Sequence, residues 1–167
     1  MGLVFQSVTL ANVAAIFDRH SWKYRLMDNH LVTAFNDVLM VFGVEEEREI
    51  VMLQSPIVPG KGMEGYVPVQ ESAERDVAVY LMAVNYRLAL GAYTRDHRDG
   101  EIRYEISVPV VGSILSDEQI EHMVLVTGTT ITVHAPIINS ILTGATPLQE
   151  ALNALDRVHS LPPEMAV

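Results

Sequence analysis

The hydrophobic positions of this 167-residue chain recur with two different periods, and each change of period marks a new element. The segment after Ser7 or Thr9, either of which can cap a helix, has the spacing of one helical face and predicts a first helix of about three turns. Its apolar positions are Leu10, Val13, Ala14 and Phe17. From Trp22 to Leu26 the period is two, as in a strand buried on one side, and Asp28-Asn29 then predicts a hairpin turn.

Two longer apolar runs follow, residues 31–44 and 49–57, and the acidic residues 45–47 separate them. Together with the first strand they predict a three-stranded antiparallel meander. The centres of both runs are continuously apolar, so both faces of the sheet carry hydrophobic side chains. Because one face of an antiparallel sheet commonly meets water, this pattern predicts that another element or a partner protein covers the second face.

Two methionines lie in these runs, and flexible thioether side chains are common on adaptable binding surfaces. The even-numbered residues around them are therefore the predicted protein-interaction residues, on the hypothesis that they form one partner-facing patch. These residues are Val38, Met40, Phe42 and Met52. The other face of the sheet remains an alternative. Most aromatic residues are instead predicted to be core: Trp22, Tyr24, Phe35, Phe42 and Tyr104.

The middle of the chain predicts a loop, a helix and a second hairpin. Prolines and glycines crowd residues 56–68, which indicates a long connection. A helical stripe returns at Glu71, and Gly91 ends it. Residues 93–96 and 101–108 then predict two strands around a tight turn. Apolar and polar residues alternate strictly in the second strand, so one of its faces is expected to meet solvent.

The state of residues 124–133 is the main ambiguity in the last third of the chain. Ser116 and Gln119 form a capping box, so a third helix is expected to begin there. Its continuation over residues 124–133 is rich in β-branched residues, and their β-strand propensity alone would predict a strand. The helical interpretation is favoured because Pro136 would then kink the element rather than end it. A ridge of small residues would also lie on one side of this helix: Gly128, Thr132 and Ala135.

A second capping box at residues 146–149 predicts a short last helix that ends near Val158, and residues 161–167 form a predicted loose tail. The whole pattern predicts one α+β domain over residues 1–160. It consists of an antiparallel sheet of about five strands with helices packed on it, in the order α-β-β-β-α-β-β-α.

The amino-acid composition reduces the number of possible function classes. Apolar residues make up 49% of the chain and charged residues 19%, as in globular proteins rather than disordered ones. The net charge of −10 disfavours nucleic acid and anionic membranes as partners. The absence of cysteine excludes disulfides and thiol chemistry, and it suits a reducing compartment. Since the N-terminus lacks the pattern of a signal peptide, a cytoplasmic location is expected.

Several short motifs resemble those of the YbjN-type bacterial sensory-transduction regulators, which share the fold of type III secretion chaperones. They are Asn85-Tyr86, Gly91-Ala92-Tyr93, the stretch from Asp99 to Tyr104, the stretch from His134 to Ile138, Gly144, and Thr146-Pro147. The resemblance extends over most of the chain. It implies a chaperone-like fold, homodimers and protein partners, and it implies no catalytic residues.

Other motifs are weaker. Residues 60–65 match the dinucleotide-binding pattern G-x-G-x-x-G, but no helix opens after them, so they are predicted to be a loop without a ligand. The six histidines have no metal-ligand spacing, and Glu118 with His122 is predicted to be a solvated helical pair. His134 is expected to bond a carbonyl that Pro136 frees. No catalytic, cofactor-binding or metal-binding residue is assigned, and no cofactor is expected.

Three classes of function remain. The favoured class is a non-enzymatic protein-interaction module, chaperone-like or regulatory, that forms homodimers and buries an apolar surface of a protein partner. The alternative is a domain that senses a small molecule in a pocket near residues 56–68 and Asn85, although a structural bond from Asn85 to the neighbouring hairpin is the preferred interpretation of that residue. An enzyme is third, because no convergent set of polar groups is recognisable.

Overall fold

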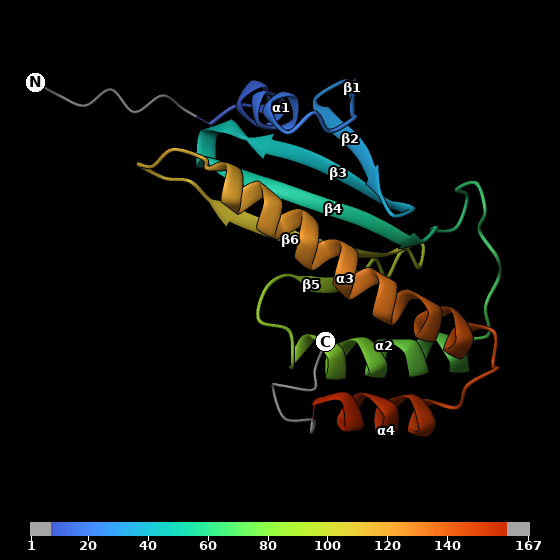
Figure 1. Ribbon diagram of the computed structural model, residues 1–167. Coiled ribbons are helices and arrows are strands. Elements are labelled where there is room, and N and C mark those ends of the chain that lie inside the picture. The colour runs from blue at the N-terminus through green and yellow to red at the C-terminus, as the bar shows by residue number, and fades with distance from the viewer. Residues whose placement is uncertain (1–7, 160–167) are drawn as a thin grey trace, which may run out of the picture.

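The computed structural model describes residues 8–159, and it confirms an α+β architecture (Figure 1). The helices are α1 (Leu10–Arg19), α2 (Glu71–Asn85), α3 (Asp117–Leu142) and α4 (Leu148–His159). The strands are β1 (Arg25–Met27), β2 (His30–Phe35), β3 (Val38–Glu45), β4 (Ile50–Val58), β5 (Ala92–Arg95) and β6 (Ile102–Pro109). They form one antiparallel sheet in the order β1-β2-β3-β4-β6-β5. The predicted tail, residues 161–167, lies outside the described residues.

The sheet has six strands rather than about five because the apolar run 31–44 is two strands. Asn36 and Asp37 reverse the chain between β2 and β3, with φ angles of 48° and 65°. Two consecutive left-handed residues make a tight turn whose twist suits a hairpin, and Asn and Asp adopt that conformation more readily than most residues. The first predicted strand is shorter than expected, since only Arg25–Met27 pairs with β2.

Helices α1 and α3 pack on one face of the sheet and touch each other. The centre of this packing is Phe17 of α1, whose side chain is fully buried. Its ring centroid lies 5.2 Å from that of Trp22 and 5.4 Å from that of Phe42, both in edge-to-face geometry. The predicted aromatic core is therefore present, although Trp22 and Phe35 keep partly exposed rings at its border.

Residues 124–133 are helical, because they belong to the middle of α3. The predicted capping box begins the helix, with the Gln119 amide donating to Ser116 Oγ at 3.2 Å and the Ser116 amide donating to Gln119 Oε1 at 2.9 Å. Apolar side chains at helical spacing then face the sheet, and this burial outweighs the preference of β-branched residues for strands. The buried positions in this part are Ile120, Met123, Val124, Thr127 and Ile131.

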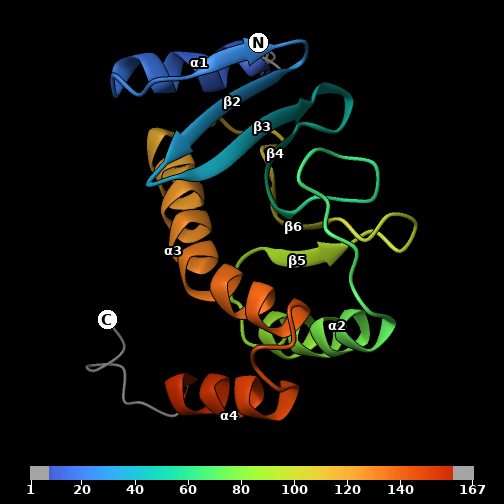
Figure 2. The ribbon, with the colours of Figure 1, turned by 90° about the vertical axis from the view of Figure 1, so that its right-hand side faces the viewer.

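Helix α3 is long and bends along its course, as Figure 2 shows. Pro136 lies inside it and removes one backbone donor, which is the usual cause of such a bend. Among the described residues, α3 is the one helix long and apolar enough to cross a membrane. Core helices of soluble proteins pass the same test, and here α3 packs on β3, β4 and β6.

A buried polar cluster joins α2, α3 and β5. His134 Nδ1 lies 2.9 Å from the Tyr80 hydroxyl of α2, and the bond of this histidine to a carbonyl that Pro136 frees stays a prediction. Burial raises the pKa of Tyr80 to about 12, so its hydroxyl stays protonated at neutral pH. Tyr93 donates to the Thr130 carbonyl at 3.0 Å. These bonds fix the C-terminal half of α3 against the end of the sheet.

Asn85 has the predicted structural role, a bond to the neighbouring hairpin. Its side-chain amide donates to the Tyr93 carbonyl at 2.9 Å, and its Oδ1 accepts from the Tyr93 amide at 2.8 Å. Strand β5 is an edge strand, and unpaired backbone groups at an edge invite pairing with another chain. The side chain of Asn85 therefore closes this edge and ties the end of α2 to it.

The G-x-G-x-x-G segment is a loop, as expected, since α2 begins only at Glu71. The loop packs on the β5–β6 turn, where the Lys61 amide donates to the Asp99 carbonyl at 2.7 Å. A Cβ atom at Gly60 would lie 2.6 Å from the Asp99 carboxyl carbon. Close contact with the hairpin, rather than with a phosphate, accounts for this glycine.

A Thr127→Val variant is expected to raise the free energy of unfolding by about 1 kcal/mol. The Thr127 side chain is fully buried, and its hydroxyl has no hydrogen-bond partner in the described part of the chain, whereas valine has the same shape without a polar atom. Urea denaturation measures the change. Thr33→Val is the matched control, because the Thr33 hydroxyl donates to the Lys23 carbonyl at 2.7 Å and its removal should be destabilising. A loss of stability in both variants would contradict the prediction.

Candidate interaction surface

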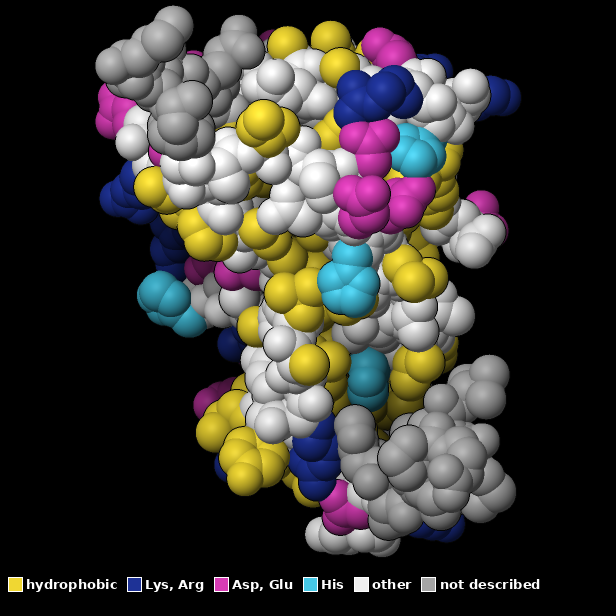
Figure 3. Space-filling view, turned by 60° about the vertical axis from the view of Figure 1, so that its left-hand side comes forward, with side chains coloured by type: hydrophobic (Ala, Val, Ile, Leu, Met, Phe, Trp, Pro, Cys, Tyr) yellow, Lys and Arg dark blue, Asp and Glu magenta, His cyan; other side chains and the backbone are white. Residues whose placement is uncertain are grey.

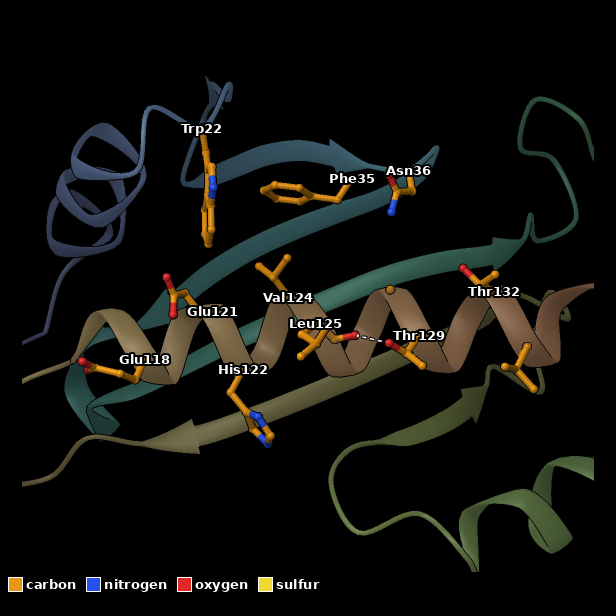
Figure 4. A pocket seen from close by; sticks show the side chains of 12 residues that line it. Trp22, Phe35, Asn36, Glu118, Glu121, His122, Val124, Leu125, Thr129 and Thr132 are labelled. Atoms are coloured by element: carbon orange, nitrogen blue, oxygen red, sulfur yellow. Dashed lines mark hydrogen bonds between the residues drawn. The ribbon is translucent and has the colours of Figure 1, made fainter. Parts of the chain in front are cut away.

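A groove of about 740 Å³ lies between the exposed side of α3 and a wall formed by Trp22 and the end of the β2–β3 hairpin. We call it the α3 groove. Its lining residues are Trp22, Phe35, Asn36, Glu118, Glu121, His122, Val124, Leu125, Gly128, Thr129, Thr132 and Val133. Figure 4 shows Trp22 and Phe35 on the wall opposite the helix. Segments about 100 residues apart in sequence thus form one hollow.

The middle of the α3 groove is apolar and open to solvent. Leu125 is 66% exposed and Val133 is 49% exposed, and together with the opposite wall they form a contiguous apolar surface in contact with solvent. The rings of Trp22 and Phe35 form the opposite wall, and their centroids are 5.0 Å apart in edge-to-face geometry. Since Phe17 packs beneath both rings, the wall is held by the core of the domain.

One end of the groove is acidic. Glu118 and Glu121 line it there, and no lysine or arginine is among the lining residues. The space-filling view shows acidic side chains gathered beside exposed hydrophobic ones (Figure 3). Hydrogen bonds from the Glu118 backbone amide and the Ser116 hydroxyl lower the pKa of the Glu118 carboxyl, so it is ionised at neutral pH.

A cluster of paired side chains fixes this acidic end to α1. Arg19 forms an ion pair with Asp117, and its hydrogen bond is the main cause of the lowered pKa of Asp117. The His20 ring lies between two carboxylates, with Nε2 3.2 Å from Asp117 and Nδ1 3.3 Å from Glu121. The same ring stacks on Trp22 at a centroid distance of 4.8 Å. The position of the tryptophan wall therefore depends on these contacts between α1 and α3.

The four predicted protein-interaction residues do not share one face of the sheet. In the antiparallel register Phe42 lies opposite Leu53, and Gly43 lies opposite Met52. Even-numbered residues of β3 therefore point to the same side as odd-numbered residues of β4. Val38, Met40 and Phe42 are buried under α1 and α3, whereas Met52 is half-buried on the opposite face. The hypothesis of a single patch is corrected, and a role of these residues in partner binding stays a prediction.

Met40 is nevertheless close to the α3 groove. A Cβ atom at Gly128 would lie 3.7 Å from Met40 Cε, an ordinary van der Waals distance, so α3 passes directly above this methionine. Gly128 and Thr132, two members of the predicted ridge of small residues, line the groove. Ala135, the third member, does not line the groove.

The sequence contains a local signal for the groove. Leu125, Thr129 and Val133 recur every four residues on α3, in addition to the buried stripe of that helix. Exposed apolar residues that recur on one side of a helix can mark an interaction surface. Trp22 and Phe35 were placed in the core, and no local pattern indicates that they also line a surface.

A second hollow, of about 820 Å³, lies where the small-molecule alternative expected one. The loop after β4, the start of α2 and the end of α3 form it, and Gln70, Asp76 and Asn139 are among its polar lining residues. Asn85 does not line it. Within residues 8–159 no group of three or more histidine, aspartate or glutamate side chains has the geometry of a metal site. Glu118 and His122 are exposed on α3.

Comparison with solved structures identifies the fold. No protein-family model and no curated protein matches the sequence. The structure is similar to the crystal structure of YbjN from E. coli, with a TM-score of 0.59 and 14% identity, over 81% of this chain and 96% of that chain. The chain has a YbjN-like fold. This confirms the fold that the resemblance in sequence implied.

A second solved structure also matches, that of the HopA1-SchA chaperone-effector complex. The TM-score is 0.47 and the identity is 12%, over 71% of this chain and 90% of that chain. The YbjN-like fold therefore rests on the first match. The groove and the second hollow are the features of this chain that bear on its function.

Proposed function

We propose that the protein is a non-enzymatic interaction module, chaperone-like or regulatory, and that it binds an apolar segment of a partner protein in the α3 groove. The exposure of Leu125 and Val133 opposite an aromatic wall carries this proposal. Aliphatic side chains left in water along a hollow commonly mark a site where another molecule excludes that water. The YbjN-like fold is in keeping with it, since YbjN is described as a candidate transcription regulator.

The chemistry of the groove supports binding rather than catalysis. Its ionisable residues, Glu118, Glu121 and His122, lie at one end and face an apolar middle. The Thr129 hydroxyl donates to the Leu125 carbonyl at 2.8 Å, so its proton is directed into the helix and not toward a base. Convergent polar groups around an apolar pocket are what an active site requires, and this arrangement does not supply them.

We further propose that the domain, residues 1–160, forms homodimers through a surface other than the groove. An exposed apolar stripe runs along α2 through Val79, Met82 and Tyr86, and the Tyr86 side chain is 90% exposed. Spacings of three and four residues put the three side chains on one helical face. Self-association there would leave the α3 groove open to a different protein. A cytoplasmic location fits the cysteine-free sequence and the acidic net charge.

A Leu125→Asp variant is expected to lose partner binding by about tenfold or more, because it puts a charge in the apolar middle of the groove. Affinity capture of the tagged protein from its native cells, followed by mass spectrometry, measures the loss. Since Leu125 is exposed, the variant should keep its fold and its oligomeric state, which thermal unfolding and light scattering check.

The matched control for this variant is Ile114→Asp. Ile114 is an exposed aliphatic residue in the loop before α3, and it does not line the groove. A partner that is lost from Leu125→Asp and retained by Ile114→Asp supports the groove as the binding site. A partner retained equally by both variants contradicts it.

Small-molecule sensing is the second candidate, and the hollow between the loop after β4, α2 and α3 favours it. A volume of about 820 Å³ with both apolar and polar lining is within the usual range of ligand pockets. A metabolite that raises the melting temperature of the protein, but not that of an Asp76→Leu variant, would support this function.

A further inference from the structure

The backbone hydrogen bonds of a bound peptide restrict what the α3 groove can accept. None of the lining residues belongs to the edge strands β1 and β5. A peptide that binds as an added β-strand needs such an edge, because its amides and carbonyls pair with the unpaired backbone groups there. A helix satisfies its own backbone, so it is the form that this lining accepts.

The dimensions of the groove agree with a short helix. The lining on α3 runs from Glu118 to Val133, which is about 22 Å at the helical rise of 1.5 Å per residue. A partner helix of about 15 residues has the same length. Its side chains at positions i, i+4, i+7 and i+11 would then contact Leu125, Val133 and the rings of Trp22 and Phe35.

The acidic end of the groove determines which charge the bound helix should carry there. The groove contains two glutamates at one end and no lysine or arginine, within a chain of net charge −10. Arg19, beside the acidic end, is already paired with Asp117. Glu118 is exposed on α3, and the side chain of Glu121 is 47% exposed although it contacts His20. Both carboxylates are thus accessible to a cation that arrives with the occupant.

We infer that the α3 groove recognises an amphipathic helix whose apolar face carries lysine or arginine at one end, where it meets Glu118 and Glu121. This inference rests on the proposed function and adds the chemistry of the partner. The apolar face supplies the affinity by covering Leu125 and Val133. The basic residues fix the direction of the helix and speed its association.

The protein contains its own reporter for this binding. Trp22 is the single tryptophan of the chain, and it lines the groove. Its fluorescence can be titrated with a 16-residue alanine-based peptide, free of aromatic residues, that has leucines at i, i+4, i+7 and i+11 and two arginines at one end. The comparison peptide has two glutamates in place of the arginines. The arginine peptide should bind about tenfold more tightly at low salt, and added salt should reduce the difference.

Three variants complete the test. The double substitution Glu118→Gln and Glu121→Gln should remove the preference for the arginine peptide, and Leu125→Asp should abolish binding of both peptides. The control is Glu46→Gln with Glu47→Gln, two exposed acids in the turn between β3 and β4, and it should leave the preference unchanged.

The outcomes separate the two proposals. Equal affinity for the two peptides, with no effect of the double substitution Glu118→Gln and Glu121→Gln, would overturn the inference about charge and leave the groove as an apolar site. If neither peptide changes the fluorescence of Trp22 at millimolar concentration, both the inference and the groove as a binding site are overturned.

Discussion

A Met40→Asp variant is expected to unfold. Met40 is fully buried between β3 and Gly128 of α3, so the substitution removes a large apolar side chain and places a carboxyl group where no water reaches it. The combined cost is about 5 kcal/mol or more, which is comparable to the whole stability of a small domain. Circular dichroism and urea denaturation measure the loss.

Met52→Asp is the control for this result. Met52 lies half-buried on the opposite face of the sheet, beside Gly43 and Ser107. The aspartate remains hydrated there, and the expected loss is about 1 kcal/mol, mainly from the low strand propensity of aspartate. If Met40→Asp stayed folded and Met52→Asp did not, the assignment of the two faces would be wrong.

Gly91→Ala is the second substitution with a large expected effect, about 4 kcal/mol of destabilisation. Gly91 joins α2 to β5 with a φ of 73°, a conformation that strains any residue with a Cβ atom. A Cβ atom would also lie 2.6 Å from Cζ of Tyr104, which is fully buried and donates to the Leu90 carbonyl at 2.5 Å. The turn and the tyrosine cannot both keep their positions.

The Gly112→Ala variant separates backbone strain from the contact with Tyr104. Gly112 has a similar φ of 64°, but a Cβ atom there meets nothing within 4 Å. Its substitution should cost only the backbone strain, about 1–2 kcal/mol. Urea denaturation of both variants measures the difference, and equal losses would mean that the contact with Tyr104 contributes nothing.

The groove and the core depend on the same few side chains. Phe17 packs against Trp22, Phe35 and Phe42, so one buried ring supports both the sheet and the wall of the groove. The contacts of His20 with Asp117 and Glu121 join the acidic end to α1 in the same way. A binding surface built on a packed core keeps its shape without a ligand, which lowers the entropy cost of binding.

Local patterns predicted most of the secondary structure, but not the division of residues 31–44 into two strands. The capping box at Ser116 and Gln119 located the start of α3, and the buried stripe explains why its β-branched middle is helical. Asn85 was correctly placed against the neighbouring hairpin. The missed turn at Asn36-Asp37 had a local signal of its own, since both residues favour the left-handed conformation.

The sequence by itself determined most elements of this protein and its α+β class, because helical and strand periods, caps and turn residues act over a few neighbouring positions. Only the tertiary structure decided which face of each strand is core, since pairing Gly43 with Met52 puts residues of equal parity on opposite sides. It also created the α3 groove, whose two walls come from residues 22–36 and 118–133 and meet only when α3 crosses the sheet. Side chains that distant interact through packing, and no local preference encodes their contact.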